Sequence, residues 1–151
     1  MTTTYGSCAM PTGADPQLLL LDTSAAVALC VADHSAHEAT ADALAGAELG
    51  LAGHAAFETF SVLTRLPAPV RLTPAVTARL LARAFPHSRF LTADAARRLL
   101  DSLPDLRLAG GAVYDALVAG VAAEHGLPLV SRDGRAVDTY SRLDVDVRLL
   151  A

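Results

Sequence analysis

The feature that most constrains the fold is a repeated alternation of short apolar runs with longer helical segments. The first run, Leu18–Leu21, consists of four leucines and ends abruptly at Asp22-Thr23-Ser24. This pattern is typical of a buried strand followed by a helix N-cap. Strands that alternate with helices form βαβ units and a mostly parallel sheet. The chain is therefore predicted to be an α/β protein with a mostly parallel central sheet flanked by helices.

Caps, turns and prolines set the bounds of the expected elements. Thr73-Pro74 and Thr92 are typical helix starts, and Gly126 is a typical helix end. The expected strands are 18–21, 48–52, 106–108, 127–131 and 145–150. The expected helices are 25–31, 37–45, 55–66, 74–85, 93–103 and 112–125, with a short helix after the Asp133-Gly134 turn.

The length of 151 residues fits one domain, and a content of 52% apolar and 19% charged residues excludes a disordered chain. We expect a single domain over 18–151, preceded by a disordered or loosely ordered tail over 1–17. The tail has neither the basic nor the apolar region of a signal peptide. Every long apolar stretch is interrupted before the roughly 18 residues that a membrane span needs. We therefore expect a cytoplasmic protein without a membrane partner.

Four acidic residues fall where an α/β sheet places its functional loops. Asp22 and Asp133 directly follow expected strands. Glu58 and Asp115 lie in the first turns of expected helices. Each acid taken alone is equally compatible with a helix cap, a first-turn acid or an Asp-Gly turn. Because loops and helix starts converge on the carboxyl ends of parallel strands, we expect the four carboxylates to lie together at that edge.

Such a cluster of carboxylates favours a bound divalent cation. Crowded carboxylates repel one another and raise each other's pKa, and a hard cation removes this repulsion. Oxygen ligands without Cys or His favour Mg²⁺ or Mn²⁺, and these ions can activate water and stabilise charge on a phosphoryl oxygen. This chemistry requires no lysine, and all twelve basic residues of the chain are arginine. The absence of Lys excludes Walker P-loop kinases, Schiff-base enzymes and receiver domains.

Four stretches of the chain resemble a known family. They are LLLLDTSAAVAL, GHAAFETFSVLTRLP, GGAVYDALVAGVAAEHGLPLVSRD and VDVRLL, which together cover residues 18–150. The chain resembles PIN-domain proteins, specifically the VapC type of toxin ribonuclease from type II toxin–antitoxin systems. The resemblance implies a PIN-like three-layer sandwich. It also places Asp22, Glu58, Asp115 and Asp133 at the family's four acidic positions.

The activity implied by the resemblance is a Mg²⁺- or Mn²⁺-dependent endoribonuclease. Water would attack an RNA phosphodiester and leave a 5′-phosphate and a 3′-hydroxyl. Asp22 and Asp115 would be the principal metal ligands, and Glu58 and Asp133 would complete the cluster. The hydroxyls expected to support these carboxylates are those of Thr23, Ser24 and Ser131. The resemblance also implies a homodimer and a cognate VapB-like antitoxin whose C-terminal segment covers the cleft.

A chain of net charge −4 must hold RNA through local basic groups. The candidates are Arg65, Arg71, Arg132 and Arg135, although each is equally compatible with an ordinary solvated arginine. Two alternatives remain open at this point. One is an inactive PIN-like binding module, and the other is a PIN-type nuclease that acts on a different nucleic acid.

Overall fold

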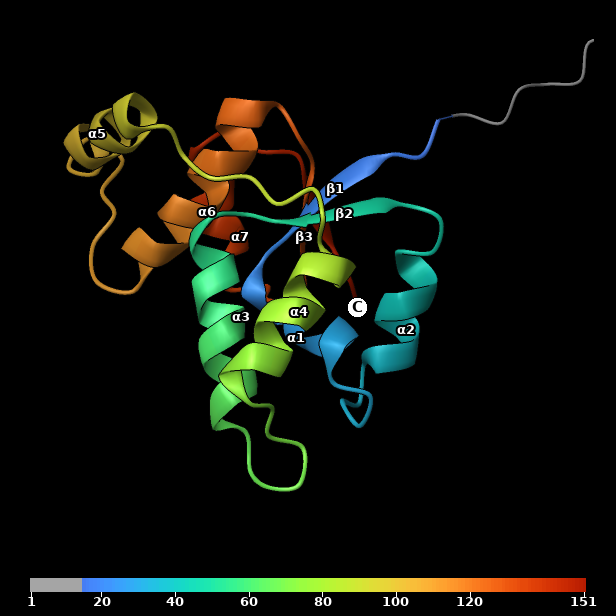
Figure 1. Ribbon diagram of the computed structural model, residues 1–151. Helices are drawn as coiled ribbons and strands as arrows, with labels where there is room; N and C mark the ends of the chain where they lie inside the picture. The colour runs from blue at the N-terminus through green and yellow to red at the C-terminus, as the bar shows by residue number, and fades with distance from the viewer. Residues whose placement is uncertain (1–14) are drawn as a thin grey trace, which may run out of the picture.

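A wholly parallel four-stranded sheet, in the order β2-β1-β3-β4, forms the centre of the fold (Figure 1). The structure is a computed structural model that describes residues 15–151. Within these residues the strands are β1 (Leu18–Leu21), β2 (Glu48–Leu51), β3 (Leu129–Ser131) and β4 (Val147–Leu149). The helices are α1 (Thr23–Cys30), α2 (His37–Ala43), α3 (His54–Arg65), α4 (Pro74–Ala84), α5 (Ala93–Ser102), α6 (Ala112–His125) and α7 (Val137–Arg142). This arrangement confirms the predicted α/β fold.

The expected tail of residues 1–17 lies outside the described residues, apart from 15–17. Those three residues are exposed and have no regular secondary structure. None of the helices described between residues 15 and 151 has the length and apolar character that a membrane span requires.

Alternate side chains of β1 face two helical layers, as the period of a strand requires. Leu20 packs with Val118 of α6 and Tyr140 of α7 on one side of the sheet. Leu19 and Leu21 pack on the other side, in a cluster that also contains Ala25, Ala26, Leu44, Leu51, Phe85 and Val130. Figure 1 shows α6 and α7 on one side of the strands, with α1 and α4 on the other. These layers make the three-layer sandwich that the resemblance implies.

The strand predicted over 106–108 is wrong, because this segment forms turns. Arg107 has a φ of +55°, and the Leu108 N–H donates to the carbonyl of Leu103 instead of to a neighbouring strand. Leu106 and Leu108 pack against Leu99 of α5. These leucines therefore cover a small core beside α5 and α6 and do not belong to the sheet.

The strand order places the ends of β1 and β3 side by side. β1 pairs with β2 on one edge and with β3 on the other, so the chain reverses its direction of travel across the sheet at β1. Leu21 is in register with Val130, and the Asp22 N–H donates to the Val130 carbonyl at 3.0 Å. The residues that follow β1 and β3 therefore meet at a topological switch point, which is where open α/β sheets form their binding crevices.

Candidate active site

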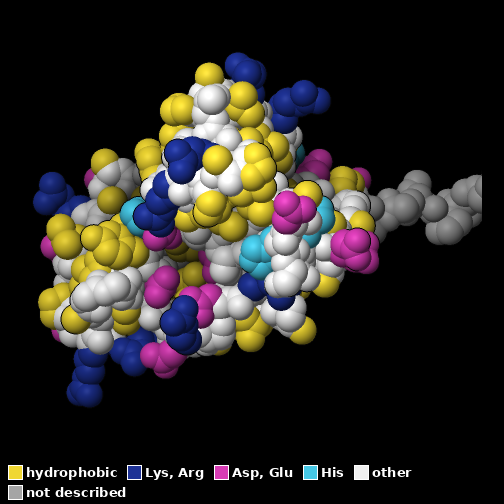
Figure 2. Space-filling model, turned by 90° about the horizontal axis from the view of Figure 1, so that it is seen from below, with side chains coloured by type: hydrophobic (Ala, Val, Ile, Leu, Met, Phe, Trp, Pro, Cys, Tyr) yellow, Lys and Arg dark blue, Asp and Glu magenta, His cyan; other side chains and the backbone are white. Residues whose placement is uncertain are grey.

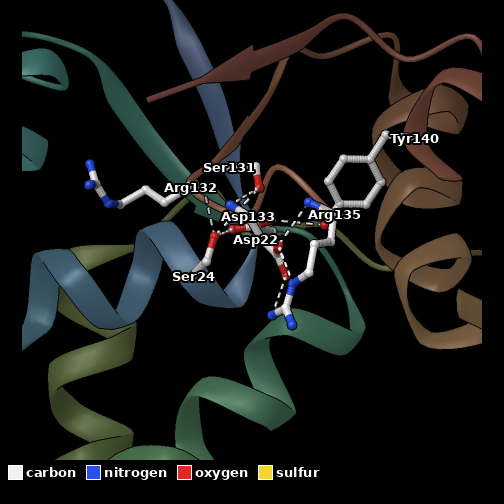
Figure 3. Close-up of polar contacts among 7 residues, drawn as sticks. All are labelled: Asp22, Ser24, Ser131, Arg132, Asp133, Arg135 and Tyr140. Atoms are coloured by element: carbon white, nitrogen blue, oxygen red, sulfur yellow. Dashed lines mark hydrogen bonds and ion pairs between the residues drawn. The ribbon is translucent and has the colours of Figure 1, made fainter. Parts of the chain in front are cut away.

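Asp22, at the carboxyl end of β1, is held by three donors, two of which, Ser24 and Tyr140, are drawn in Figure 3. It is the N-cap of α1, and its Oδ1 accepts hydrogen bonds from the Ala25 N–H at 3.0 Å and the Ser24 hydroxyl at 2.6 Å. Its Oδ2 accepts from the Tyr140 hydroxyl at 2.9 Å. Only 4% of Asp22 is exposed, and a charge removed from water needs such partners. The residue is therefore both a helix cap and part of the site.

Glu58 is joined to the start of α1 by a hydroxyl. The Thr23 hydroxyl donates to Glu58 Oε2 at 2.7 Å. Helix α3 begins at His54, so Glu58 is its fifth residue and lies in the second turn instead of the predicted first turn. The sharp turn before the helix is made by Gly53, with a φ of +49°, and a Cβ on this residue would lie 2.6 Å from Val121 Cγ2. This close approach sets α3 against α6.

Two serine hydroxyls hold the loop after β3 beside Asp22. Ser24 Oγ accepts from the Arg132 backbone N–H at 2.8 Å and lies 3.5 Å from Ser131 Oγ. Ser131 Oγ accepts from the Asp133 N–H at 3.0 Å. These contacts tie the backbone that carries Asp133 to the first turn of α1. They are consistent with the supporting role expected of the two serines.

Asp133 is paired with an arginine from its own turn. Its Oδ1 accepts from the backbone N–H of Arg135 at 3.0 Å and from the side-chain Nε at 3.2 Å. The guanidinium bond is the main reason why the pKa of Asp133 is lowered. The Arg135 side chain is 93% exposed, so it can move away from Asp133 without disturbing the core.

Asp115 lies in the first turn of α6, as predicted. Its pKa is raised, first by burial and then by the negative charges of Asp133, Glu58 and Asp22. The positive charge of Arg135 opposes this shift. Asp115 therefore lies where the fields of the other acids add together.

The four acids line one pocket of about 290 Å³, which we call the acidic pocket. Its lining consists of Asp22, Thr23, Ser24, Glu58, Asp115, Val118, Asp133, Ala136 and Tyr140. Figure 2 shows acidic side chains gathered around a hollow, with basic side chains beside it. The structure thus brings together the four carboxylates that the sequence places on four separate segments.

Tyr140 lines this pocket but is not among the site residues that the sequence predicts. The residue is 1% exposed and belongs to the core cluster that contains Val118 of α6, while its hydroxyl reaches Asp22. Burial, and then the negative charge of Asp22, raise the pKa of Tyr140 above its usual value, so the hydroxyl remains a donor. The only signal in the sequence is a tyrosine seven residues after Asp133, and nothing local indicates where its hydroxyl lies.

The four candidate arginines fall into two pairs. Arg132 and Arg135 line a second groove of about 420 Å³, the arginine groove, which shares part of its lining with the acidic pocket. Arg65 is the last residue of α3. Arg71 lies in the following loop, where its Nε donates to the Leu66 carbonyl at 2.7 Å. Arg65 and Arg71 line neither the acidic pocket nor the arginine groove.

Comparison with known proteins gives consistent matches at the level of sequence and fold. The family model described as "PIN domain" matches residues 19–142. Ribonuclease VapC27 of Mycobacterium tuberculosis is 47% identical over 133 residues, which cover 88% of this chain and 97% of the relative. Ribonuclease VapC40 of the same organism is 46% identical over 131 residues, covering 85% and 96%.

A solved structure shows the same fold at low sequence identity. VapBC2 from Rickettsia felis, crystallised with a DNA fragment from its promoter, matches with a TM-score of 0.62 and 13% identity. The match covers 89% of this chain and all of the matched chain.

Proposed function

The chain belongs to the PIN-domain family and to its VapC type, and on that premise we propose that it is a metal-dependent endoribonuclease that acts as the toxin of a toxin–antitoxin pair. The observation that carries the proposal is the convergence of Asp22, Glu58, Asp115 and Asp133 on one pocket at the carboxyl edge of the sheet. Nearly full coverage of two curated ribonucleases supports the assignment to RNA.

The residues of the acidic pocket fit a divalent cation. Its polar lining consists of oxygen donors, the class that Mg²⁺ and Mn²⁺ prefer. Burial, and then the negative charges of the other three acids, raise the pKa of Asp115, and a bound cation would relieve this repulsion. Across residues 15–151, no three Asp, Glu, His or Cys side chains already stand as a metal-binding group. Binding of the cation in the acidic pocket would therefore involve side-chain movements, such as release of the exposed Arg135 from Asp133.

Asp22 and Asp115 would hold the cation, and Glu58 and Asp133 would complete the cluster directly or through water. When bound, Mg²⁺ or Mn²⁺ activates water and neutralises charge on the phosphate. In the reaction, a bond forms between the water oxygen and phosphorus while the bond from phosphorus to the 3′ oxygen breaks. The proton lost by the water is balanced by the proton gained by the 3′ oxygen. The products are a 5′-phosphate and a 3′-hydroxyl.

The side chains around the carboxylates set the geometry and hold the RNA. The hydroxyl of Thr23 orients Glu58, while Ser24 and Ser131 fix Asp22 and the loop that carries Asp133. On the proposed function, the arginine groove holds a phosphate next to the scissile one, because a guanidinium binds phosphate through two parallel hydrogen bonds. Arg65 and Arg71 would then contact only a more distant part of the RNA.

The protein partners that we propose are a VapB-like antitoxin and a second copy of the chain. A largely apolar groove of about 260 Å³ is lined by Phe57 and Phe90, which are 68% and 51% exposed. His54, another residue of the groove lining, has its Nε2 3.9 Å from Oε1 of Glu58, so the groove borders the acidic pocket and suits an apolar antitoxin segment that also covers that pocket. We expect Phe57→Asp to weaken co-purification with the product of a short upstream reading frame, whereas Val76→Asp on α4 leaves it unchanged. Light scattering of the purified toxin should give twice the mass of the chain.

The decisive experiment is cleavage of labelled RNA by purified protein. We expect cleavage that requires Mg²⁺ or Mn²⁺, stops with EDTA and falls by more than about a hundredfold in Asp22→Asn and Asp115→Asn. Asp101→Asn is the matched control, because it removes an exposed carboxylate on α5. Chemical mapping of the product ends should show 5′-phosphates.

Two outcomes would favour the alternatives. Cleavage of DNA at the rate of RNA would favour a nuclease of another substrate class. A wild-type protein that cleaves neither and binds no Mn²⁺ in calorimetry would be a binding module.

A further inference from the structure

The carboxylate of Asp22 has most of its acceptor capacity occupied by its own chain. An ionised carboxylate offers roughly four acceptor sites, two on each oxygen. Oδ1 accepts from the Ser24 hydroxyl and from the Ala25 N–H, so both of its sites are used. Oδ2 accepts one hydrogen bond, from Tyr140. One acceptor site therefore remains, and it is on Oδ2.

Tyr140 is rigidly placed for this contact. Its ring packs in the buried cluster that contains Leu20, Val118 and Leu129, while its hydroxyl lies in the lining of the acidic pocket. Helix α7, which carries it, follows directly on the turn that carries Asp133. The hydroxyl therefore comes from the rigid core and not from a mobile surface segment. Figure 3 shows it approaching Asp22 from the side opposite Ser24.

From this geometry we propose that Tyr140 is a positioning residue for Asp22. Its hydroxyl, together with the two donors on Oδ1, fixes the plane of the carboxylate, so that the one free site on Oδ2 would be presented to the divalent cation in a single orientation. The inference rests on the metal-dependent function proposed above and adds a residue that the acidic pattern does not contain. Asp22 would then offer the cation only its Oδ2.

Loss of the hydroxyl should affect the cation more than the fold. Tyr140→Phe keeps the ring and its packing, but Oδ2 then loses its only donor, and the carboxylate is held from the Oδ1 side alone. Outer partners of metal ligands typically contribute about 10- to 100-fold to metal affinity. The competing role is displacement, in which Tyr140 occupies the place of the cation and its removal tightens binding. The two roles therefore predict shifts of opposite sign.

The test is Mn²⁺ binding by calorimetry to the full chain, with wild type compared with Tyr140→Phe. We expect the dissociation constant to rise about 10-fold or more. In RNA cleavage, the Mg²⁺ concentration for half-maximal rate should rise by a similar factor, while the rate at saturating Mg²⁺ returns to within a few-fold of wild type. This split separates positioning from general structural damage, which added metal does not repair. Tyr114→Phe is the matched control, because its ring is exposed and lies outside the lining of the acidic pocket.

Each outcome has a distinct meaning. Unchanged or tighter Mn²⁺ binding in Tyr140→Phe, with normal binding in wild type, would overturn the positioning role and leave the proposed function intact. No Mn²⁺ binding in wild type would overturn both. If Tyr140→Phe failed to fold, as judged by circular dichroism, the same titration on Ser24→Ala and Ser24→Thr would decide. These variants act on the opposite oxygen of Asp22, and a positioning network requires weaker binding in Ser24→Ala with recovery in Ser24→Thr.

Discussion

At the scale of single residues, the acids of the pocket differ in how their charge is compensated. Asp22 has three hydrogen-bond donors, and Asp133 has the guanidinium of Arg135. Burial, and then repulsion by the other carboxylates, instead raise the pKa of Asp115. A binding site that attracts a cation must hold this repulsion in its metal-free state, so part of the stability of the fold is given up for the site.

Asp115→Asn should therefore stabilise the metal-free protein. Because the folded-state pKa of Asp115 is raised, ionisation of its carboxyl group opposes folding. This free-energy cost of ionisation is absent below about pH 4 and is fully present above the raised pKa. At pH 7 we expect the melting temperature of Asp115→Asn to exceed that of the wild type by up to roughly 2–4 °C. Solvent screening weakens the repulsion at this half-buried position and so limits the increase. Thermal unfolding in EDTA measures this effect, with Asp101→Asn as the control. A lower melting temperature at pH 7 would contradict the prediction.

At the scale of elements, β2 is covered closely by the chain that follows α4. The N–H groups of His87 and Arg89 donate to the carbonyls of Leu49 and Leu51, which extends the sheet edge by a short irregular segment. This segment passes so near Gly50 that a Cβ there would lie 2.2 Å from the His87 carbonyl oxygen. A glycine in the middle of a strand is explained by this contact, which lies 37 residues away in the chain.

Gly50→Ala should consequently destabilise the fold by about 1–3 kcal/mol or more, because backbone and not a flexible side chain must move. Urea unfolding followed by circular dichroism measures the change. Gly111→Ala is the matched control, since a Cβ at Gly111 meets nothing within 4 Å. Equal effects of the two substitutions would show that the close approach has no energetic consequence.

The start of α5 is held by a contact from α6. Thr92 is the N-cap of α5, and both its backbone N–H and its hydroxyl donate to the carboxylate of Glu124, at 3.1 Å and 2.6 Å. These bonds lower the pKa of Glu124. A lowered pKa in the folded state means that the stabilisation is present above the ordinary Glu pKa and is lost as the pH falls through the lowered value.

Glu124→Gln should then reduce the melting temperature at pH 7, and the difference should vanish in acid, once the pH has fallen through the lowered pKa of Glu124 and the wild-type carboxyl is protonated. Unfolding curves of both proteins across this range give the pH dependence. A difference that persisted at low pH would indicate a packing effect of the substitution and not the loss of the hydrogen bonds from Thr92 to the ionised carboxylate.

At the scale of the whole molecule, the strand order brings together in the site residues that are far apart in sequence. Asp22 lies at the start of the domain, and Asp133 and Tyr140 near its end. A cation bound there links both ends of the chain in the folded state only. Binding that requires the folded state stabilises it by about 2.7 kcal/mol at a hundred times the dissociation constant.

Saturating Mg²⁺ should for this reason raise the melting temperature of the wild-type protein by several degrees, at about 2–4 °C per kcal/mol. Asp22→Asn should show no such rise. Differential scanning fluorimetry at constant ionic strength measures both. An equal rise in the variant would place the bound Mg²⁺ outside the acidic pocket.

The sequence by itself determined the elements whose signals are local. The four leucines before Asp22, the Thr73 and Thr92 caps and the glycine after His125 each act within a turn or a few residues, so their effects can be read directly. The convergence of the four acids also followed, because parallel strands must end at a common edge. An apolar run such as 106–108 did not determine a strand, since a strand needs a hydrogen-bonding partner that local sequence does not specify.

Only the tertiary structure decided what each acid touches. The hydroxyl of Tyr140 meets Asp22 across 118 residues, and Thr23 meets Glu58 across 35. The tertiary structure also places Arg132 and Arg135 beside the acidic pocket, whereas Arg65 and Arg71 lie outside its lining. Hydrophobic periodicity reports which face of an element is buried, but the side chains that meet across the pocket depend on how α1, α3, α6 and α7 pack around the sheet. The elements are local properties of this chain, whereas the contacts that organise its acidic pocket are a property of the packed molecule.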